Sequence, residues 1–204
     1  PLGGADAVIE AVVENGYNAV MVHGLDDDWG ATYPSDYFPF AGWRNFEKDT
    51  LANIIDRCHA EGVRVIVYAP CVMFTKDPRY ADIPPDEAAS FDPSAPIDPR
   101  DREGKRLTSL DSEFRELFVA ALKEICALGA DGLWIDGFSM EESNRVGEPW
   151  AHGAATFSKE TGLNWPMKED WESDAFRRWV RWRYDRHMRN GAWIAEQVRA
   201  EYPE

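Results

Sequence analysis

The stretch Gly129-Ala-Asp-Gly-Leu-Trp-Ile-Asp-Gly-Phe-Ser-Met-Glu-Glu142 changes from an apolar segment into a cluster of carboxylates. Leu133, Trp134 and Ile135 suit a short buried strand, and glycines punctuate both of its ends. Asp136 is the last residue of this predicted strand. A carboxylate at that position points beyond the carboxyl edge of a sheet, where parallel α/β folds place their chemistry. The alternative is that Asp136 caps the next turn, as Asp before Gly often does.

A helix that ends at a glycine and leads into a short apolar strand occurs three times along the chain. Glycine just past a helix is a common stop signal, because it adopts the left-handed conformation without steric cost. Strands that alternate with helices predict parallel βα units. The predicted helix and strand pairs are 5–15 with 16–23, 48–61 with 62–68, and 112–128 with 129–136.

The connections that leave the strands are long, whereas those that enter them are short. Residues 24–47 and 69–111 follow the first two strands and are rich in Pro, Asp, Gly and aromatic residues. Loops of this length usually carry function, and their placement on one face is typical of a (β/α) barrel. No glycine-rich phosphate turn follows any strand, so a Rossmann-type cofactor site is not expected, and we predict no cofactor.

After Asp136 we expect a polar loop and then a long helix over about 173–201, with no strand behind it. The fold class is therefore predicted to be α/β of the (β/α)8 TIM-barrel type. We expect residues 1–204 to form a single domain that is an incomplete barrel, covering roughly the first half and truncated at its C-terminus. The remainder of the parent barrel would then be a partner of this chain.

Composition narrows the class of partner. The chain has 44% hydrophobic residues, enough for a sizeable core, and a formal charge of −15, which opposes nucleic acid or an anionic membrane as a partner. No apolar run reaches the roughly 18 residues that cross a bilayer. Cys58, Cys71 and Cys126 are widely spaced without a CxxC motif, which indicates free thiols, two of them in helices.

His23 ends the first predicted strand, and Asp26-Asp-Asp28 follows it closely. We predict that His23 contacts substrate, with a structural histidine at a strand end as the alternative. The three aspartates lack the spacing of a calcium loop, and the chain has no HExxH motif. We therefore expect a solvated acidic turn and no metal, and a metal-dependent hydrolase that uses His23 and Asp26 is the rival interpretation.

Many of the nine Trp and seven Tyr residues fall in the predicted loops. Sugar rings stack on aromatic side chains while their hydroxyls bind short polar groups, so this composition suits carbohydrate; the alternative is that the rings pin the loops to the fold. Glu141 is either a substrate contact or an acidic residue near a helix start. The long helix places its own tryptophans in packing positions. Candidate substrate contacts are His23, Trp29, Tyr33, Tyr68, Trp134 and Glu141.

Several segments resemble one group of barrel proteins, named hypothetical glycosyl hydrolase 6. They are Tyr17-Asn-Ala-Val20, Gly30-Ala-Thr-Tyr-Pro34, Asp49-Thr-Leu51, His59-Ala-Glu-Gly-Val-Arg-Val-Ile-Val-Tyr68, Gly129-Ala-Asp-Gly-Leu-Trp-Ile-Asp-Gly137, Phe157-Ser-Lys-Glu-Thr-Gly-Leu-Asn-Trp-Pro166 and Phe176-Arg-Arg-Trp-Val-Arg-Trp-Arg183. Trp134-Ile-Asp-Gly137 also resembles the strand end that carries the nucleophile of the alpha-L-fucosidases. That resemblance implies the same role for Asp136. The histidine pair of those enzymes is absent here, and only His23 lies nearby.

We therefore expect a glycoside hydrolase that cleaves O-glycosidic bonds by a two-carboxylate mechanism, with an oligosaccharide or glycoside as its substrate. Asp136 would be the nucleophile, and the acid would lie beyond residue 204. A catalytically silent carbohydrate-binding barrel is the alternative from another class. In either case we expect Asp136, His23 and Tyr68 to share one cleft at the carboxyl ends of the strands.

Overall fold

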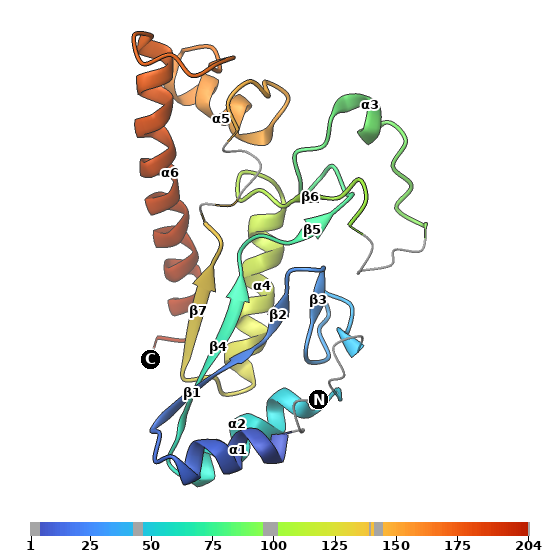
Figure 1. The fold of residues 1–204 in the computed structure, drawn as a ribbon, viewed down its shortest axis with the longest axis vertical. Helices are drawn as coiled ribbons and strands as arrows, with labels where there is room; N and C mark the ends of the chain where they lie inside the picture. The colour runs from blue at the N-terminus through green and yellow to red at the C-terminus, as the bar shows by residue number, and fades with distance from the viewer. Residues whose placement is uncertain (1–4, 43–46, 96–101, 139, 141–144, 204) are drawn as a thin grey trace. The chain divides into compact units, whose positions relative to one another are not determined.

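The structure, a computed structural model, describes residues 5–42, 47–95, 102–138, 140 and 145–203 (Figure 1). The chain divides into two compact units. The first unit comprises Pro1–Pro70, Phe118–Asp136 and Val198–Glu204, and the second comprises Cys71–Leu117 and Gly137–Gln197. Two helices, α4 (Phe114–Ala127) and α6 (Asp174–Arg199), contribute residues to both units.

A parallel three-stranded sheet of order β1-β4-β7 forms the centre of the first unit. The predicted helix and strand pairs are all confirmed, with bounds that differ by a few residues. Each of the helix-stop glycines Gly16, Gly62 and Gly129 has a positive φ, as expected. The elements are α1 (Ala5–Glu14), β1 (Ala19–His23), α2 (Thr50–Ala60), β4 (Arg64–Pro70) and β7 (Gly132–Asp136), with the small hairpin of β2 (Leu25–Asp26) and β3 (Gly30–Ala31) after β1.

One face of this sheet is buried. Val65, Val67 and Ala69 of β4 are each 0% exposed. Helix α2 contacts β4 and α1 contacts α2, and Ile125 of α4 reaches the same layer as Val67. This alternation of buried and more exposed residues along β4 fixes which residues of the neighbouring strands lie on the other face.

The opposite face of the sheet is exposed within the part of the chain that the structure describes. Met21 of β1 is 54% exposed and Trp134 of β7 is 56% exposed. The expectation that Leu133, Trp134 and Ile135 form a buried strand is therefore wrong, because Trp134 is exposed and Leu133 and Ile135 are half-buried. Among the described elements, helix α2 packs against the other face of the sheet. Among the described residues three parallel strands are present, and they do not close a barrel.

The second unit is built around aromatic packing between α5 (His152–Thr161) and α6. The Phe157 ring meets Trp165 and Trp182 edge to face, at centroid distances of 5.7 and 5.4 Å. Trp179 and Trp182 are each 4% exposed, which confirms that they are packing residues. Trp165 is also buried, so this ring belongs to the core of the unit. The remaining elements are α3 (Pro85–Ala88) and the antiparallel pair of β5 (Phe74–Thr75) and β6 (Arg106–Leu107).

Helix α5 lies in the segment that was predicted to be a polar loop. Its sequence, His-Gly-Ala-Ala-Thr-Phe-Ser-Lys-Glu-Thr, has little apolar periodicity, so the pattern did not indicate a helix. Phe157 anchors it in the aromatic core, and Gly162 ends it with a φ of 72°. Tertiary packing thus stabilises a helix for which the local sequence has only a weak preference.

The three cysteines are free thiols, as predicted, with Cys58 and Cys126 in helices. Burial raises the pKa of both helical thiols. Within the described residues, no helix combines the length and the apolar character needed to cross a membrane.

Close packing at Gly24 gives a direct test of the first unit. A Cβ atom at Gly24 would lie 2.4 Å from Val67 Cγ1 and 2.9 Å from Ile125 Cδ1, two side chains that are fully buried. We expect Gly24→Ala to lower the free energy of unfolding by about 1–3 kcal/mol through overpacking. Urea denaturation followed by circular dichroism measures this.

Gly132→Ala is the matched control, because a Cβ there would meet its nearest atom, Ile66 Cγ1, at an ordinary 3.8 Å. Replacing this strand glycine should leave stability unchanged or raise it by about 0.5 kcal/mol. Equal stability of the two variants would contradict the packing described for β1, β4 and α4.

Candidate functional site

The register of the sheet brings three predicted site residues to the carboxyl ends of neighbouring strands. His23 pairs with Tyr68, and Pro70 pairs with Asp136. Paired residues of parallel strands project to the same face, and so do residues two apart along one strand. His23, Tyr68 and Asp136 therefore share the exposed face and the same end of the sheet.

Direct contacts link these three side chains. The Tyr68 hydroxyl donates a hydrogen bond to Asp136 Oδ2 at 3.1 Å. The His23 and Tyr68 rings lie 4.7 Å apart between centroids, tilted by 44°. Asp136 ends a parallel strand, as predicted, and among the described strands β7 lies at an edge of the sheet. The Asp136 carboxylate is exposed and is oriented by a phenol from the next strand.

Trp134 extends this group along the sheet, because it pairs with Tyr68 in the register and lies two residues before Asp136. Its indole is 56% exposed, so an aromatic surface lies beside the carboxylate. An exposed carboxylate, an imidazole, a phenol and an indole together offer a charged group, polar contacts and an apolar platform. This combination suits a polar ligand with apolar faces.

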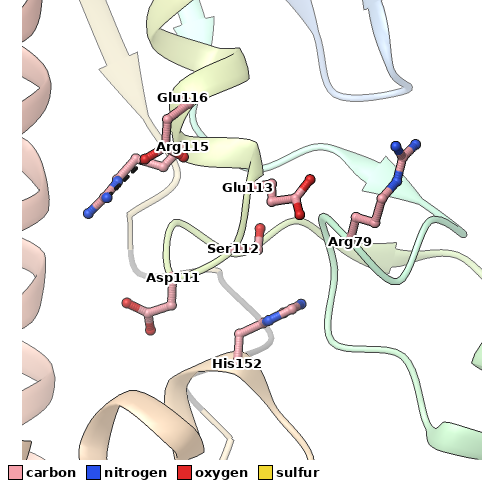
Figure 2. Close-up of a pocket in the computed structure, with 7 residues that line it drawn as sticks. All are labelled: Arg79, Asp111, Ser112, Glu113, Arg115, Glu116 and His152. Atoms are coloured by element: carbon pink, nitrogen blue, oxygen red, sulfur yellow. Dashed lines mark hydrogen bonds and ion pairs between the residues drawn. The ribbon is translucent and has the colours of Figure 1, made fainter.

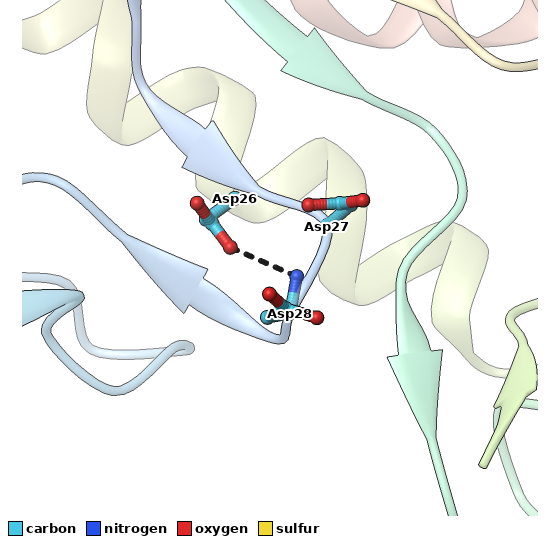
Figure 3. Close-up of side chains that lie close together, drawn as sticks. All are labelled: Asp26, Asp27 and Asp28. Atoms are coloured by element: carbon cyan, nitrogen blue, oxygen red, sulfur yellow. Dashed lines mark hydrogen bonds between the residues drawn. The ribbon is translucent and has the colours of Figure 1, made fainter. Parts of the chain in front are cut away.

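The acidic turn after β1 differs from the solvated turn that the sequence predicted. Asp26 is 7% exposed and Asp28 is 6% exposed. The Asp28 backbone N–H donates to Asp26 Oδ1 at 2.9 Å, which folds the turn back on itself (Figure 3). Carboxylate oxygens of Asp26, Asp27 and Asp28 lie within 4.8 Å of one another, and among the described residues this cluster does not include His23. The structure thus does not join His23 and Asp26 in one ligand set.

Trp29 and Tyr33, two predicted substrate contacts, pack inside the first unit. Trp29 is half-buried, has a φ of 67°, and meets Phe38 edge to face at 5.1 Å. Tyr33 is 2% exposed, and its hydroxyl donates to Ala121 O at 3.1 Å and lies 3.2 Å from Glu124 Oε2. Burial, followed by the Glu124 charge, raises the pKa of Tyr33 above its ordinary value. Glu141 lies outside the described residues.

A polar hollow of about 560 Å³ lies in the second unit (Figure 2). Most of its charges are already paired: Arg79 with Asp77, Arg115 with Glu116, and Asp111 with Arg186. In Figure 2 the Glu113 side chain points toward Arg79, whereas Asp111 points the opposite way. The lining residues are Arg79, Asp111, Ser112, Glu113, Arg115, Glu116 and His152.

Sequence reasoning did not identify the residues of this hollow. Arg79 and Asp111 fall in the predicted long loop 69–111, which marked the region but no particular side chain. His152 begins a helix that was not predicted. None of these residues belongs to a motif with a characteristic spacing, so the sequence held no signal for them beyond the length of the loop.

The fold and the strand-end group define a parallel α/β protein with an oriented carboxylate at the carboxyl end of β7. No protein-family model and no curated protein matches the sequence. Among solved structures, the chain is similar to alpha-L-fucosidase isoenzyme 2 from Paenibacillus thiaminolyticus, with a TM-score of 0.65 and 15% identity over 97% of this chain. The chain spans 27% of the length of that structure.

Two further structures are similar over a smaller share of the chain. An alpha-L-fucosidase GH29 from Bacteroides thetaiotaomicron matches 78% of this chain and 32% of its own, at 21% identity and a TM-score of 0.48. A hypothetical protein from Ruminiclostridium thermocellum matches 66% of this chain and 69% of its own, at 16% identity and a TM-score of 0.47. At these identities the likeness to each of the three structures is one of fold.

The two tyrosines give a test of the site's boundaries. Tyr33→Phe removes a buried hydroxyl that donates to Ala121 O, so we expect the free energy of unfolding to fall by about 1 kcal/mol. Tyr68→Phe removes a hydroxyl at the exposed strand ends and should change stability by less than about 0.5 kcal/mol. Thermal denaturation of both variants checks this, and a larger loss for Tyr68→Phe would contradict the assignment.

Proposed function

We propose that this chain is part of a (β/α)8-barrel glycoside hydrolase in which Asp136 is the catalytic nucleophile. The observation that carries the proposal is the exposed Asp136 carboxylate at the carboxyl end of a parallel strand, held by the Tyr68 hydroxyl at 3.1 Å. Enzymes built on parallel barrels hold their catalytic residues at this end of the strands. The fold likeness to an alpha-L-fucosidase supports the same class.

In the proposed mechanism, Asp136 attacks the anomeric carbon of a glycoside and forms a covalent glycosyl intermediate. A second carboxylic acid, about 5–5.5 Å from it, protonates the leaving oxygen and then activates water. We propose that this acid lies on another strand of the barrel. Tyr68 orients the nucleophile, His23 contacts a sugar hydroxyl, and Trp134 stacks on the apolar face of the sugar.

The exposed sheet face supports the proposal that further strands complete the fold. Parallel sheets are normally covered on both faces, because crossover helices and barrel closure leave neither face in water. Here Met21 and Trp134 are both more than half exposed. In the proposed barrel this face lines the interior, and the remaining strands bury Met21 while leaving the strand ends accessible to substrate.

Replacing the proposed nucleophile tests the mechanism in the full-length barrel. Asp136→Asn keeps the size of the side chain and removes the charge that attacks the anomeric carbon. We expect turnover on aryl glycosides, with aryl alpha-L-fucosides tested first, to fall on the order of a thousandfold or more, while substrate binding is retained. Steady-state kinetics and equilibrium binding measure the two effects.

Asp131→Asn is the matched control on the same segment. The Asp131 carboxylate accepts hydrogen bonds from the Val65 backbone N–H at 2.7 Å and from His59 Nε2 at 2.8 Å. Burial raises the pKa of Asp131, but these hydrogen bonds and the charges of His59 and Arg64 together outweigh it and lower the pKa below its ordinary value. This variant should lose stability and keep its turnover. Unchanged turnover in Asp136→Asn would remove the nucleophile, and sugar binding without any activity in the parent would favour a silent binding barrel.

The incomplete barrel predicts how the 204-residue chain behaves when expressed alone. Its exposed sheet face should drive self-association, which sedimentation velocity detects as a rise in the average sedimentation coefficient with concentration. Met21→Lys should reduce that association, because it puts a charge on the exposed face. Met188→Lys is the control, since Met188 is 75% exposed on α6 in the second unit. A concentration-independent monomer would count against the incomplete barrel.

A further inference from the structure

Asp82, in the second unit, caps a helix that begins 70 residues further along the chain. Its side chain is fully buried, and Oδ1 accepts a hydrogen bond from the backbone N–H of His152, the first residue of α5. The local N-cap residue, Ala151, has no side-chain oxygen to supply this bond. Asp82 therefore provides the acceptor that Ser, Thr or Asp usually provides from within the helix sequence.

The second oxygen of this carboxylate has no such partner. Asp82 Oδ2 is buried without a hydrogen bond in the part of the chain that the structure describes. His152 Nε2 lies 3.9 Å from Asp82 Oδ1 but only 3.2 Å from Pro78 O, so the ring is directed at the Pro78 carbonyl. An ionised carboxylate in this position is only partly compensated, which makes its charge costly.

Among the residues that the structure describes, the charged or titratable groups that act on Asp82 are His152 of α5, Asp111 of the turn before α4, and Arg186 of α6. Arg186 Nε donates to Asp111 Oδ2 at 2.6 Å, with both side chains buried. Asp111 raises the pKa of Asp82 and Arg186 lowers it, so the two members of this ion pair act on Asp82 in opposite directions. Burial consequently dominates, and despite the His152 N–H it raises the pKa of Asp82 to about 6.

We propose that Asp82 is a proton-dependent latch that holds the first turn of α5 in place when its carboxyl group is protonated and releases it when the group ionises. Ionised Asp82 is a good partner for a helix N-terminus, but its charge is stable only in contact with water. Water reaches it when the first turn of α5 moves away. His152 lines the polar hollow, so the latch also sets the position of one wall of that hollow.

The direction of the pH effect follows from the raised pKa. The folded-state pKa of Asp82 is about 6 against an ordinary 3.8, so its stabilising contribution is fully present below 3.8 and is lost as the pH rises through 6. Across this pH window, the hydrogen-exchange protection of α5 in the second unit should fall by up to about a hundredfold. The latch is thus held more tightly closed in acid than at neutral pH, and it is independent of any role of Asp136.

Nuclear magnetic resonance of the 204-residue chain tests the latch directly. The backbone amide of His152 should report the protonation of Asp82, with a midpoint near pH 6. Asp82→Asn should abolish this titration, whereas Asp86→Asn, which changes an exposed aspartate in α3, should leave it intact. Hydrogen exchange of α5, corrected for intrinsic rates, should accelerate from acid to neutral pH in the parent and not in Asp82→Asn. A flat His152 amide, or a midpoint near about 4 as for an ordinary Asp, would overturn the proposal.

A second variant, His152→Ala, tests the same proposal if Asp82→Asn does not fold. This variant retains the backbone N–H and removes the imidazole, whose positive form lowers the pKa of Asp82. The amide of residue 152 should still titrate, with a midpoint at higher pH. Loss of the titration in His152→Ala would assign it to the imidazole ring and would also overturn the latch.

Discussion

The parallel register between β1, β4 and β7 is the constraint on which the candidate site depends. It pairs His23 with Tyr68 and brings Asp136 within hydrogen-bond distance of the Tyr68 hydroxyl. The fully buried Val65 and Val67 fix this register, since a shift of one residue would turn their side chains to the exposed face. The apolar residues of β4 therefore position the polar group on the opposite face of the same strand.

The exposed face of the sheet links folding and function. It carries the apolar Met21, whose burial would stabilise the protein, together with Trp134 and Asp136, which our proposal assigns to substrate. In the proposed barrel, one set of additional strands both removes Met21 from water and supplies the second carboxylate. On this proposal, the site and the stability of the sheet depend on the same additional strands.

Periodic segments were predictable from the sequence, whereas partnerships between distant residues were not. Helix α2 and strand β4 follow from their apolar spacing and the glycine between them. The sequence could not distinguish the buried Tyr33 from Tyr68 at the strand ends, because Glu124, a hydrogen-bond partner of the Tyr33 hydroxyl, lies 91 residues away in the chain. Asp82 likewise was one acidic residue among many, and only the fold shows that it caps a helix that begins at His152.

Asp82 and Asp136 show how burial decides what a carboxylate does. Asp82 is enclosed with one oxygen unsatisfied, so its protonation is coupled to the packing of α5. Asp136 is exposed and accepts a hydrogen bond from a phenol, so in this chain it meets both solvent and the Tyr68 hydroxyl. In a closed barrel much of that solvent would be excluded, and a hydrogen bond in a less polar environment is stronger. The Tyr68 hydroxyl would then carry more of the stabilisation of Asp136, which makes Tyr68 more important to the complete protein than to the chain alone.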